Sequence, residues 1–376
     1  MRIKLKQNMI AICMIVVSFA IACLFQIYGN KTYNRYNSEN IHYNRGTVIE
    51  ILDESITYDK ISDSHIGRQE IKVLMKDGKY KNKEIELSNN ITKTHQVMVK
   101  KGMDIIVNVD APKNLKPYFT VYNYNRILPI ILSTACLLLV IFMIGKGKGV
   151  KAIIGLMYCI FLVIYILLPM IFSGLSPILI SMGCIILATI VTLLLLNGKS
   201  KKTLAAILST IAGISVSLVF FQIISRLMHV NGFSSSEAEG LLLISEETGL
   251  NVKNVLFVGI MISSLGAVMD VSMSIVSAVY EVRRHNQELG FKELFKSGIE
   301  IGKDMIGTMC NTLILAFTGS SFVTLLVFVS YQVEFAQFIN SNFFAIEFAQ
   351  GICGTLGVVL SVPIASGFSA YFLCKE

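Results

Sequence analysis

The sequence has 376 residues, of which 53% are hydrophobic and 15% are charged. This is more apolar surface than a single soluble core can bury, so the composition excludes an ordinary soluble globular protein. The formal net charge of +8 would suit a nucleic-acid-binding protein, but the basic residues gather between apolar runs, as they do in membrane proteins.

Eight apolar runs are each long enough to form a transmembrane helix, because a helix needs about 20 apolar residues to cross a hydrocarbon core of roughly 30 Å. They cover residues 9–28, 127–144, 150–172, 177–196, 204–224, 255–279, 308–329 and 343–372. The first run has some likeness to a lipoprotein signal ending at Cys23, but its length favours a retained helix. We therefore expect an α-helical multi-pass membrane protein with about 8 transmembrane helices.

The basic residues predict the orientation of these helices. Lysine and arginine cluster before the first run and in the connections after the second, fourth and sixth runs. With eight crossings these places share one side, and such clusters face the cytoplasm. We expect cytoplasmic N- and C-termini in a cell membrane, with residues 30–126 extracytoplasmic. Residues 234–249 predict a short outer helix, with a gate as the alternative. The connection at residues 280–304 is amphipathic, which predicts a place on the inner surface.

Residues 30–126 differ from the rest because short alternating runs replace the long apolar ones. The expected strands are residues 45–52, 70–75, 83–87, 96–99, 104–109 and 119–122. Gly78 and Gly102 mark turns, since glycine takes a positive φ at no steric cost. The pattern predicts a small extracytoplasmic all-β domain, OB/SH3-like, between helices 1 and 2. It separates an N-terminal transmembrane helix, residues 1–29, from a seven-helix membrane domain, residues 127–376.

The surface of this β domain carries no binding signature. Lysine and glutamate alternate along it without forming a basic stripe, which argues against a nucleic-acid ligand. Its aromatic residues Tyr118, Phe119, Tyr122 and Tyr124 precede the return to the membrane. We interpret them as an interfacial belt, and a ligand cage is the alternative.

Motifs for catalysis, cofactor binding and metal binding are absent from the sequence. Seven of the eight cysteines lie inside predicted transmembrane runs, and the five histidines show no paired ligand spacing. There is no GxSxG, HExxH or P-loop motif. We therefore expect no cofactor, no metal and no enzymatic activity.

Asp270 lies near the centre of the sixth run, where an ionisable residue is costly unless it faces water, a partner or a packed interior. Helical spacing places it on a stripe of small and polar residues, namely Gly259, Ser263, Gly266, Asp270, Ser274 and Ser277. Leu265, Val268 and Ile275 lie on the opposite side. We interpret Asp270 as a protonatable transport residue. The alternative is structural: a hydrogen bond from Asp270 to another helix.

Further polar residues mark the last two runs. Glu347 lies about one turn inside the outer end of the final run, and Pro363 is expected to bend that run. The residues predicted to act in transport or proton coupling are Asp270, Ser274, Ser263, Glu347, Asn311 and Thr312.

Three segments of the sequence resemble the YibE/F family of bacterial membrane proteins. They are Gly-Ala-Val-Met-Asp-Val at residues 266–271, Gly-Ser-Ser at 319–321 and Pro-Ile-Ala at 363–365. The likeness extends over roughly residues 128–371. It implies a multi-span protein with a variable exported segment after the first helix, in a family described as transporters.

Residues 266–284 are also similar to a stretch of the SecD/SecF and resistance-nodulation-division proteins, in which a glycine-rich helix holds a mid-membrane aspartate. In those proteins the aspartate couples proton flow to movement of an exported domain, which implies the same role for Asp270. The present chain departs from them, because it has eight predicted spans in place of a six-helix unit and its exported domain is small.

Two functions from different classes follow. In the first, the chain is a permease whose last four spans enclose a polar path, with Asp270 as the proton-coupling residue and Glu347 near its outer mouth. In the second, it is a membrane scaffold or assembly factor whose extracytoplasmic domain binds a partner. The expected partners are membrane lipids, a small solute or ion, and either another copy of the chain or a protein bound through the β domain, but no nucleic acid.

Overall fold

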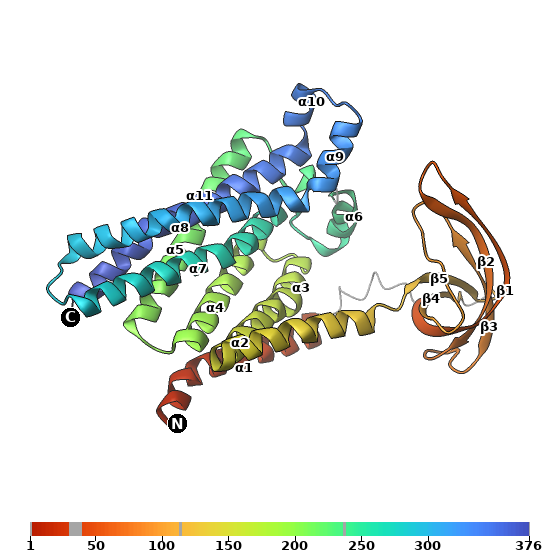
Figure 1. Cartoon of the computed structure of the whole chain (residues 1–376), viewed down its shortest axis with the longest axis horizontal. Coiled ribbons are helices and arrows are strands. Elements are labelled where there is room, and N and C mark those ends of the chain that lie inside the picture. Colours follow the sequence, from red (N-terminus) through yellow and green to blue (C-terminus); the bar gives the residue numbers. More distant parts are fainter. Residues whose placement is uncertain (1, 30–39, 113–114, 236–237, 376) are drawn as a thin grey trace. The chain divides into compact units, whose positions relative to one another are not determined.

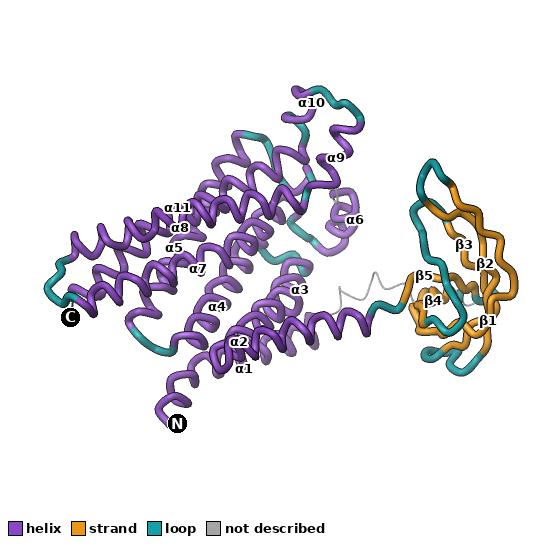
Figure 2. The backbone as a smooth tube through the Cα atoms, viewed as in Figure 1, coloured by secondary structure: helices purple, strands orange, loops and turns teal. Residues whose placement is uncertain are grey.

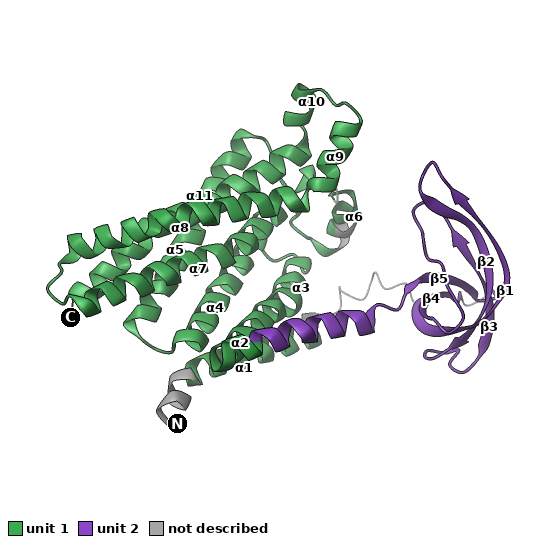
Figure 3. Cartoon of the chain, in the orientation of Figure 1, with its two compact units in different colours: residues 1–34, 142–376 green, residues 35–141 purple. Residues whose placement is uncertain are grey.

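The computed structural model describes residues 2–29, 40–112, 115–235 and 238–375 (Figure 1). These residues form two compact units (Figure 3). One unit comprises residues 1–34 and 142–376, and the other comprises residues 35–141. The division falls inside a helix, so the first turns of the second predicted span belong to the same unit as the β-strands.

The smaller unit contains a closed five-stranded β-barrel (Figure 2). Its strands are β1 (Ile41–Asp59), β2 (Ser64–Met75), β3 (Glu84–Ile91), β4 (Asp104–Asp110) and β5 (Tyr118–Tyr124). The long strand β1 pairs antiparallel with both β2 and β4, and β3 lies parallel to β5 to close the barrel. The two predicted turns are confirmed, because Gly78 has φ 74° and Gly102 has φ 86°.

The strand predicted at residues 96–99 is wrong, and the reason lies in two buried amides. Gln69 Nε2 donates to Val99 O at 3.1 Å, and Val99 N donates to Gln69 Oε1 at 3.1 Å. Asn89 Nδ2 donates to Val97 O at 2.7 Å. Val97 and Val99 are buried in the barrel core, so the alternating pattern predicted their burial correctly. Side-chain amides form hydrogen bonds with the backbone of Val97 and Val99, so these residues do not join a strand ladder.

Replacing Asn89 by alanine should therefore destabilise the barrel, because Val97 O would lose its buried donor. A buried carbonyl without a partner costs about 1–3 kcal/mol. Hydrogen exchange of barrel peptides in the whole protein would measure the change. Asn90→Ala is the matched control, since the neighbouring amide is exposed. Equal loss of protection in the two variants would contradict the stabilising role of the hydrogen bond from Asn89 to Val97 O.

The larger unit is helical. Its elements are α1 (Arg2–Gly29), α2 (Ile127–Leu162), a π-helical turn (Val163–Leu167), α3 (Leu168–Phe172), α4 (Pro177–Asn197), α5 (Lys201–Leu227), α6 (Ala238–Thr248), α7 (Val255–His285), α8 (Phe291–Ser320), α9 (Phe322–Ser330), α10 (Phe335–Ile339) and α11 (Asn342–Cys374). Single 3-10 turns precede α6 and α7. The short helix predicted between the fifth and sixth spans is confirmed as α6, and its place on the outer side stays a prediction.

Six helices among the described residues are long and apolar enough to cross a membrane, and a bent pair raises the number to seven. One of the six covers 46 residues, Ile127–Phe172, and joins the second and third predicted spans. It is broken at Lys146, whose backbone is not helical (φ 45°, ψ −129°). The loop predicted between these spans is thus reduced to a break at a single residue.

The seventh predicted span is not one straight helix. It comprises the C-terminal part of α8 and all of α9, which are bent by 59° at their junction. The amphipathic connection predicted at residues 280–304 comprises the end of α7, a turn and the first part of α8, and its place on the inner surface stays a prediction. From Phe291 onward it is the beginning of α8, where Leu294 and Gly298 are buried.

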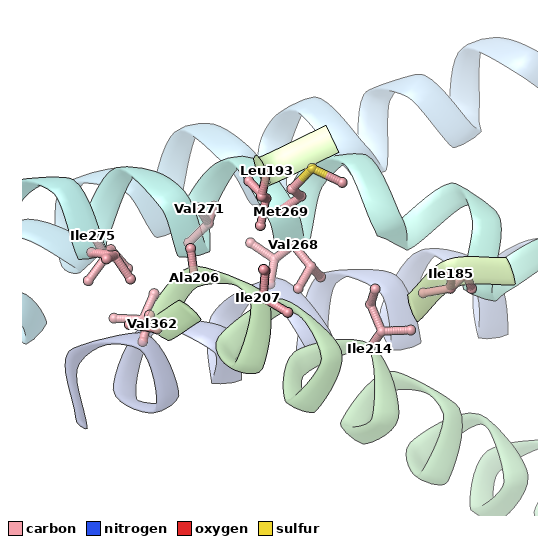
Figure 4. Close-up of a cluster of buried hydrophobic side chains, with 14 of the residues drawn as sticks. Ile185, Leu193, Ala206, Ile207, Ile214, Val268, Met269, Val271, Ile275 and Val362 are labelled. Atoms are coloured by element: carbon pink, nitrogen blue, oxygen red, sulfur yellow. The ribbon is translucent and has the colours of Figure 1, made fainter. Parts of the chain in front are cut away.

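The main core lies among α4, α5, α7, α8 and α11 (Figure 4). Val268, Val271 and Ile275 of α7 are fully buried there. Glycines let the helices approach closely. A Cβ on Gly357 of α11 would lie 1.7 Å from Ser217 Oγ and 3.2 Å from Gly213 O, both on α5. α5 and α11 therefore meet with their backbones almost in contact.

Candidate functional site: a polar face on α7 and α8

Asp270 is the central residue of α7, a helix of 31 residues. α7 packs against α4, α5, α8 and α11. Within a membrane this position would be close to the midplane, because a helix of this length exceeds the hydrocarbon thickness and its middle lies farthest from both surfaces.

The predicted stripe occupies one side of α7, as helical spacing required. Gly259, Ser263, Gly266, Asp270 and Ser274 are exposed, and Ser277 is half-buried. The opposite side holds Val268 and Ile275, which are fully buried. Leu265, predicted on that side, is half-buried. The stripe therefore faces away from the core that α7 shares with α5 and α11.

This arrangement corrects the expectation that Asp270 faces a path enclosed by the last four spans. The faces through which those helices pack hold large apolar side chains together with buried serines such as Ser217, Ser264 and Ser361, whereas the stripe that contains Asp270 is exposed. The carboxylate of Asp270 makes no hydrogen bond or ion pair with any other residue that the structure describes. A hydrogen bond from Asp270 to a neighbouring helix of the same chain is therefore not observed in these residues.

Asn311 and Thr312 lie on an exposed side of α8, together with Thr308. α7 and α8 run antiparallel and side by side (Figure 1), and Gly298 of α8 contacts Val279 of α7. Because both helices rise equally per residue, Asp270 and Thr308 lie at nearly the same height above that contact. The two helices thus carry polar residues at one level, with Asp270 among them.

Glu347 lies apart from the other five predicted residues. It is half-buried and lines a cavity of about 270 Å³ between α8, α9 and α11. The polar residues on its wall are Thr318, Ser321 and Glu347, and phenylalanines form much of the rest. Asp270, Ser263, Ser274, Asn311 and Thr312 do not line this cavity. Five of the six predicted residues therefore lie on exposed sides of α7 and α8, here called the polar face, and Glu347 lines a separate cavity.

The predicted aromatic belt of the barrel also divides. Tyr124 is structural, because its hydroxyl accepts from Met98 N at 2.8 Å and donates to Met98 O at 2.9 Å. Phe119 packs edge-on against Tyr80. Tyr122 is exposed and packs edge-on against Tyr43. Tyr124 and Phe119 are thus partly buried within the barrel, whereas Tyr118 and Tyr122 are exposed.

A second polar pocket was not predicted from the sequence. It has a volume of about 570 Å³ and lies between the end of α5 and the start of α7. Its polar lining residues are Gln222, Ser225, Arg226, His229, Asn231, Lys253 and Asn254. The feature of the sequence that could have indicated this pocket is the pair of basic residues, Arg226 and Lys253, at the two ends of a connection that is otherwise acidic. Among the described residues, no group of histidine, cysteine, aspartate or glutamate could hold a metal ion.

Comparison with known proteins gives one family. The family described as YibE/F-like protein matches residues 133–375, which is more than half of the chain. No curated protein and no solved structure matches the sequence. The matched region contains α3 to α11 and most of α2, and excludes the barrel.

Proposed function

We propose a transport function for this chain, which belongs to the YibE/F-like family: movement of a small solute or ion across a cell membrane, coupled to protons through Asp270. The observation that carries the proposal is an unpartnered carboxylate at the centre of α7, on a stripe of small and hydroxyl-bearing residues. In a bilayer such a group marks an ion or substrate pathway more often than a structural role. The proposed activity is transport and not catalysis.

The proposal includes eight crossings. A straight helix of 46 residues would be roughly 69 Å long, more than twice the hydrocarbon thickness, so we divide Ile127–Phe172 at Lys146 into two spans. With α8 and α9 counted as one span, both termini fall on the cytoplasmic side with the lysine and arginine clusters. The barrel then lies outside the cytoplasm. Its strand order, with β1 paired to β2 and β4, favours the OB type over the SH3 type.

Because the polar face is exposed in a single chain, it needs water or a second polar surface within the bilayer. A charged residue facing lipid at the helix centre costs about 2.5–3.5 kcal/mol on insertion scales. A homo-oligomer would supply that surface, since the small residues of the stripe allow close approach of another helix. We therefore propose that a second copy completes the path, with light scattering of the purified protein as the check.

The rival proposal, a membrane scaffold, is favoured by the same exposure, because stripes of small residues are also common helix interfaces. Proton flux separates the two. Liposomes that contain the purified chain and an internal pH dye should acidify faster than empty liposomes when a potassium diffusion potential draws protons inward. Acidification no faster than in empty liposomes would remove the transport proposal and leave the scaffold.

A further inference from the structure

Three basic side chains, here called its rim, line the pocket at the end of α5. Arg226, His229 and Lys253 all line it, and all three are exposed. Phe257 and Val230, both buried, form part of its apolar wall. The pocket therefore combines this cationic rim with an apolar part of its wall, here called its floor.

The backbone at the end of α5 brings Arg226 and His229 together. Val230 N donates to Ser225 O at 2.9 Å, which closes the last turn of the helix, and His229 takes a left-handed conformation with φ 55°. Glycine is the usual residue at such a position. The chain reverses at His229, three residues after Arg226, and both side chains line the pocket.

A second close contact brings Lys253 to that rim. A Cβ on Gly232 would lie only 1.7 Å from Val252 O, so the loop after α5 lies directly against the segment before α7. Lys253 is the next residue along that segment. The two walls of the pocket are thus fixed to each other by backbone contact and do not depend on long side chains.

The charge on the rim is not neutralised within the described part of the chain. Arg226 lies in the last turn of α5, where a cation is favourable near the negative end of the helix dipole. Lys253 has no such explanation, because it precedes the positive end of α7, whose first turn contains no acidic residue. Neither Arg226 nor Lys253 makes a hydrogen bond or ion pair with another described residue.

We propose that this pocket binds a phosphate group. Arginine presents paired donors that match phosphate oxygens, lysine adds a compact charge, and the start of a long helix adds positive potential. The volume of about 570 Å³ leaves room for more than the anion, and the apolar floor suits a glycerol or acyl segment. The ligand is therefore free phosphate or the phosphate of a lipid headgroup. The site is independent of Asp270 and of the proposed transport.

Thermal unfolding of the purified full chain in detergent tests this binding, since a ligand that binds the folded state raises the midpoint in a saturable way. One arm titrates inorganic phosphate against chloride at equal ionic strength. The other adds micelles of short-chain phosphatidylglycerol against micelles of a phosphate-free glycolipid. A saturable rise in the first arm assigns free phosphate, and a rise in the second arm alone assigns a lipid headgroup. No rise in either arm overturns the proposal.

Variants locate the site. Lys253→Gln should weaken the apparent affinity at least tenfold, and Arg226→Gln should act in the same direction. His229→Gly removes the imidazole while suiting the left-handed backbone, so it should weaken binding without lowering the unfolding midpoint of the free protein. Lys292→Gln on α8, an exposed lysine remote from the pocket in sequence, is the control and should bind as wild type. Equal weakening in the control and in Lys253→Gln would also overturn the proposal.

Discussion

Gly357→Val is expected to lower the stability of the helical unit by about 3 kcal/mol or more, which is the upper end of the range for overpacking a filled core. Even a Cβ at this position would lie 1.7 Å from Ser217 Oγ, and Gly213 O stands 3.2 Å away. The added side chain would force α5 and α11 apart along their shared core. The midpoint of thermal unfolding in detergent, followed by circular dichroism, would measure the loss.

Two further variants isolate the cause. Gly307→Val on α8 introduces the same side chain where nothing lies within 4 Å, so it should change the midpoint far less. Ser217→Ala should partly restore a Gly357→Ala protein, because the atom closest to the new Cβ is the Ser217 hydroxyl oxygen. If Gly357→Val unfolds at the same temperature as Gly307→Val, the backbone contact between α5 and α11 is not what holds these helices together.

Asp270→Asn is expected to reduce proton flux in liposomes at least tenfold, toward the rate of empty vesicles. Asparagine keeps the size of the side chain and removes its ability to release a proton. The unfolding midpoint should stay the same or rise, because the substitution removes a charge that has no partner among the described residues. Flux and stability should therefore change independently.

Asp304→Asn is the control, since Asp304 is another exposed acid, located on α8. It should retain wild-type flux. Ser263→Ala and Ser274→Ala should have smaller effects than Asp270→Asn, because hydroxyl groups on the stripe assist proton transfer without supplying the charge. Full flux in Asp270→Asn would defeat the coupling role. Normal flux together with a fall in stability would support the scaffold.

Secondary-structure elements could be predicted from the sequence better than the residues with which they pair and pack. Alternation identified β1 to β5, and it also identified the burial of Val97 and Val99, but it could not show that Gln69 and Asn89 take the place of a strand ladder. That outcome depends on residues distant in the chain. Likewise the apolar runs predicted the helices, whereas the 59° bend between α8 and α9 was not predicted, although it falls at Gly319-Ser320-Ser321 and glycine and serine are common at helix kinks.

For the candidate site too, the sequence predicted which residues share a face but not what surrounds them. The period of the helix showed that Ser263, Gly266 and Asp270 share a face, but periodicity does not say which way that face points. The direction follows from packing, because α5 and α11 cover the side that holds Val268 and Ile275. The pocket at Arg226 and Lys253 was not predicted, because it depends on the contact of Gly232 with Val252 O. That contact joins the end of one predicted span to the start of the next, which the sequence alone does not show.

The central place of α11 bears on the order in which the protein assembles during synthesis. α11 follows α5, α7 and α8 in the chain, and it supplies Val358, Val362 and Ala365 to their common core. A nascent chain would therefore carry three helices whose shared partner has not yet left the ribosome, and under the eight-span proposal these three would already be in the membrane. The cluster of α1, α2 and α4 can form earlier. Insertion chaperones would thus be needed most for the interval between the translation of α8 and that of α11.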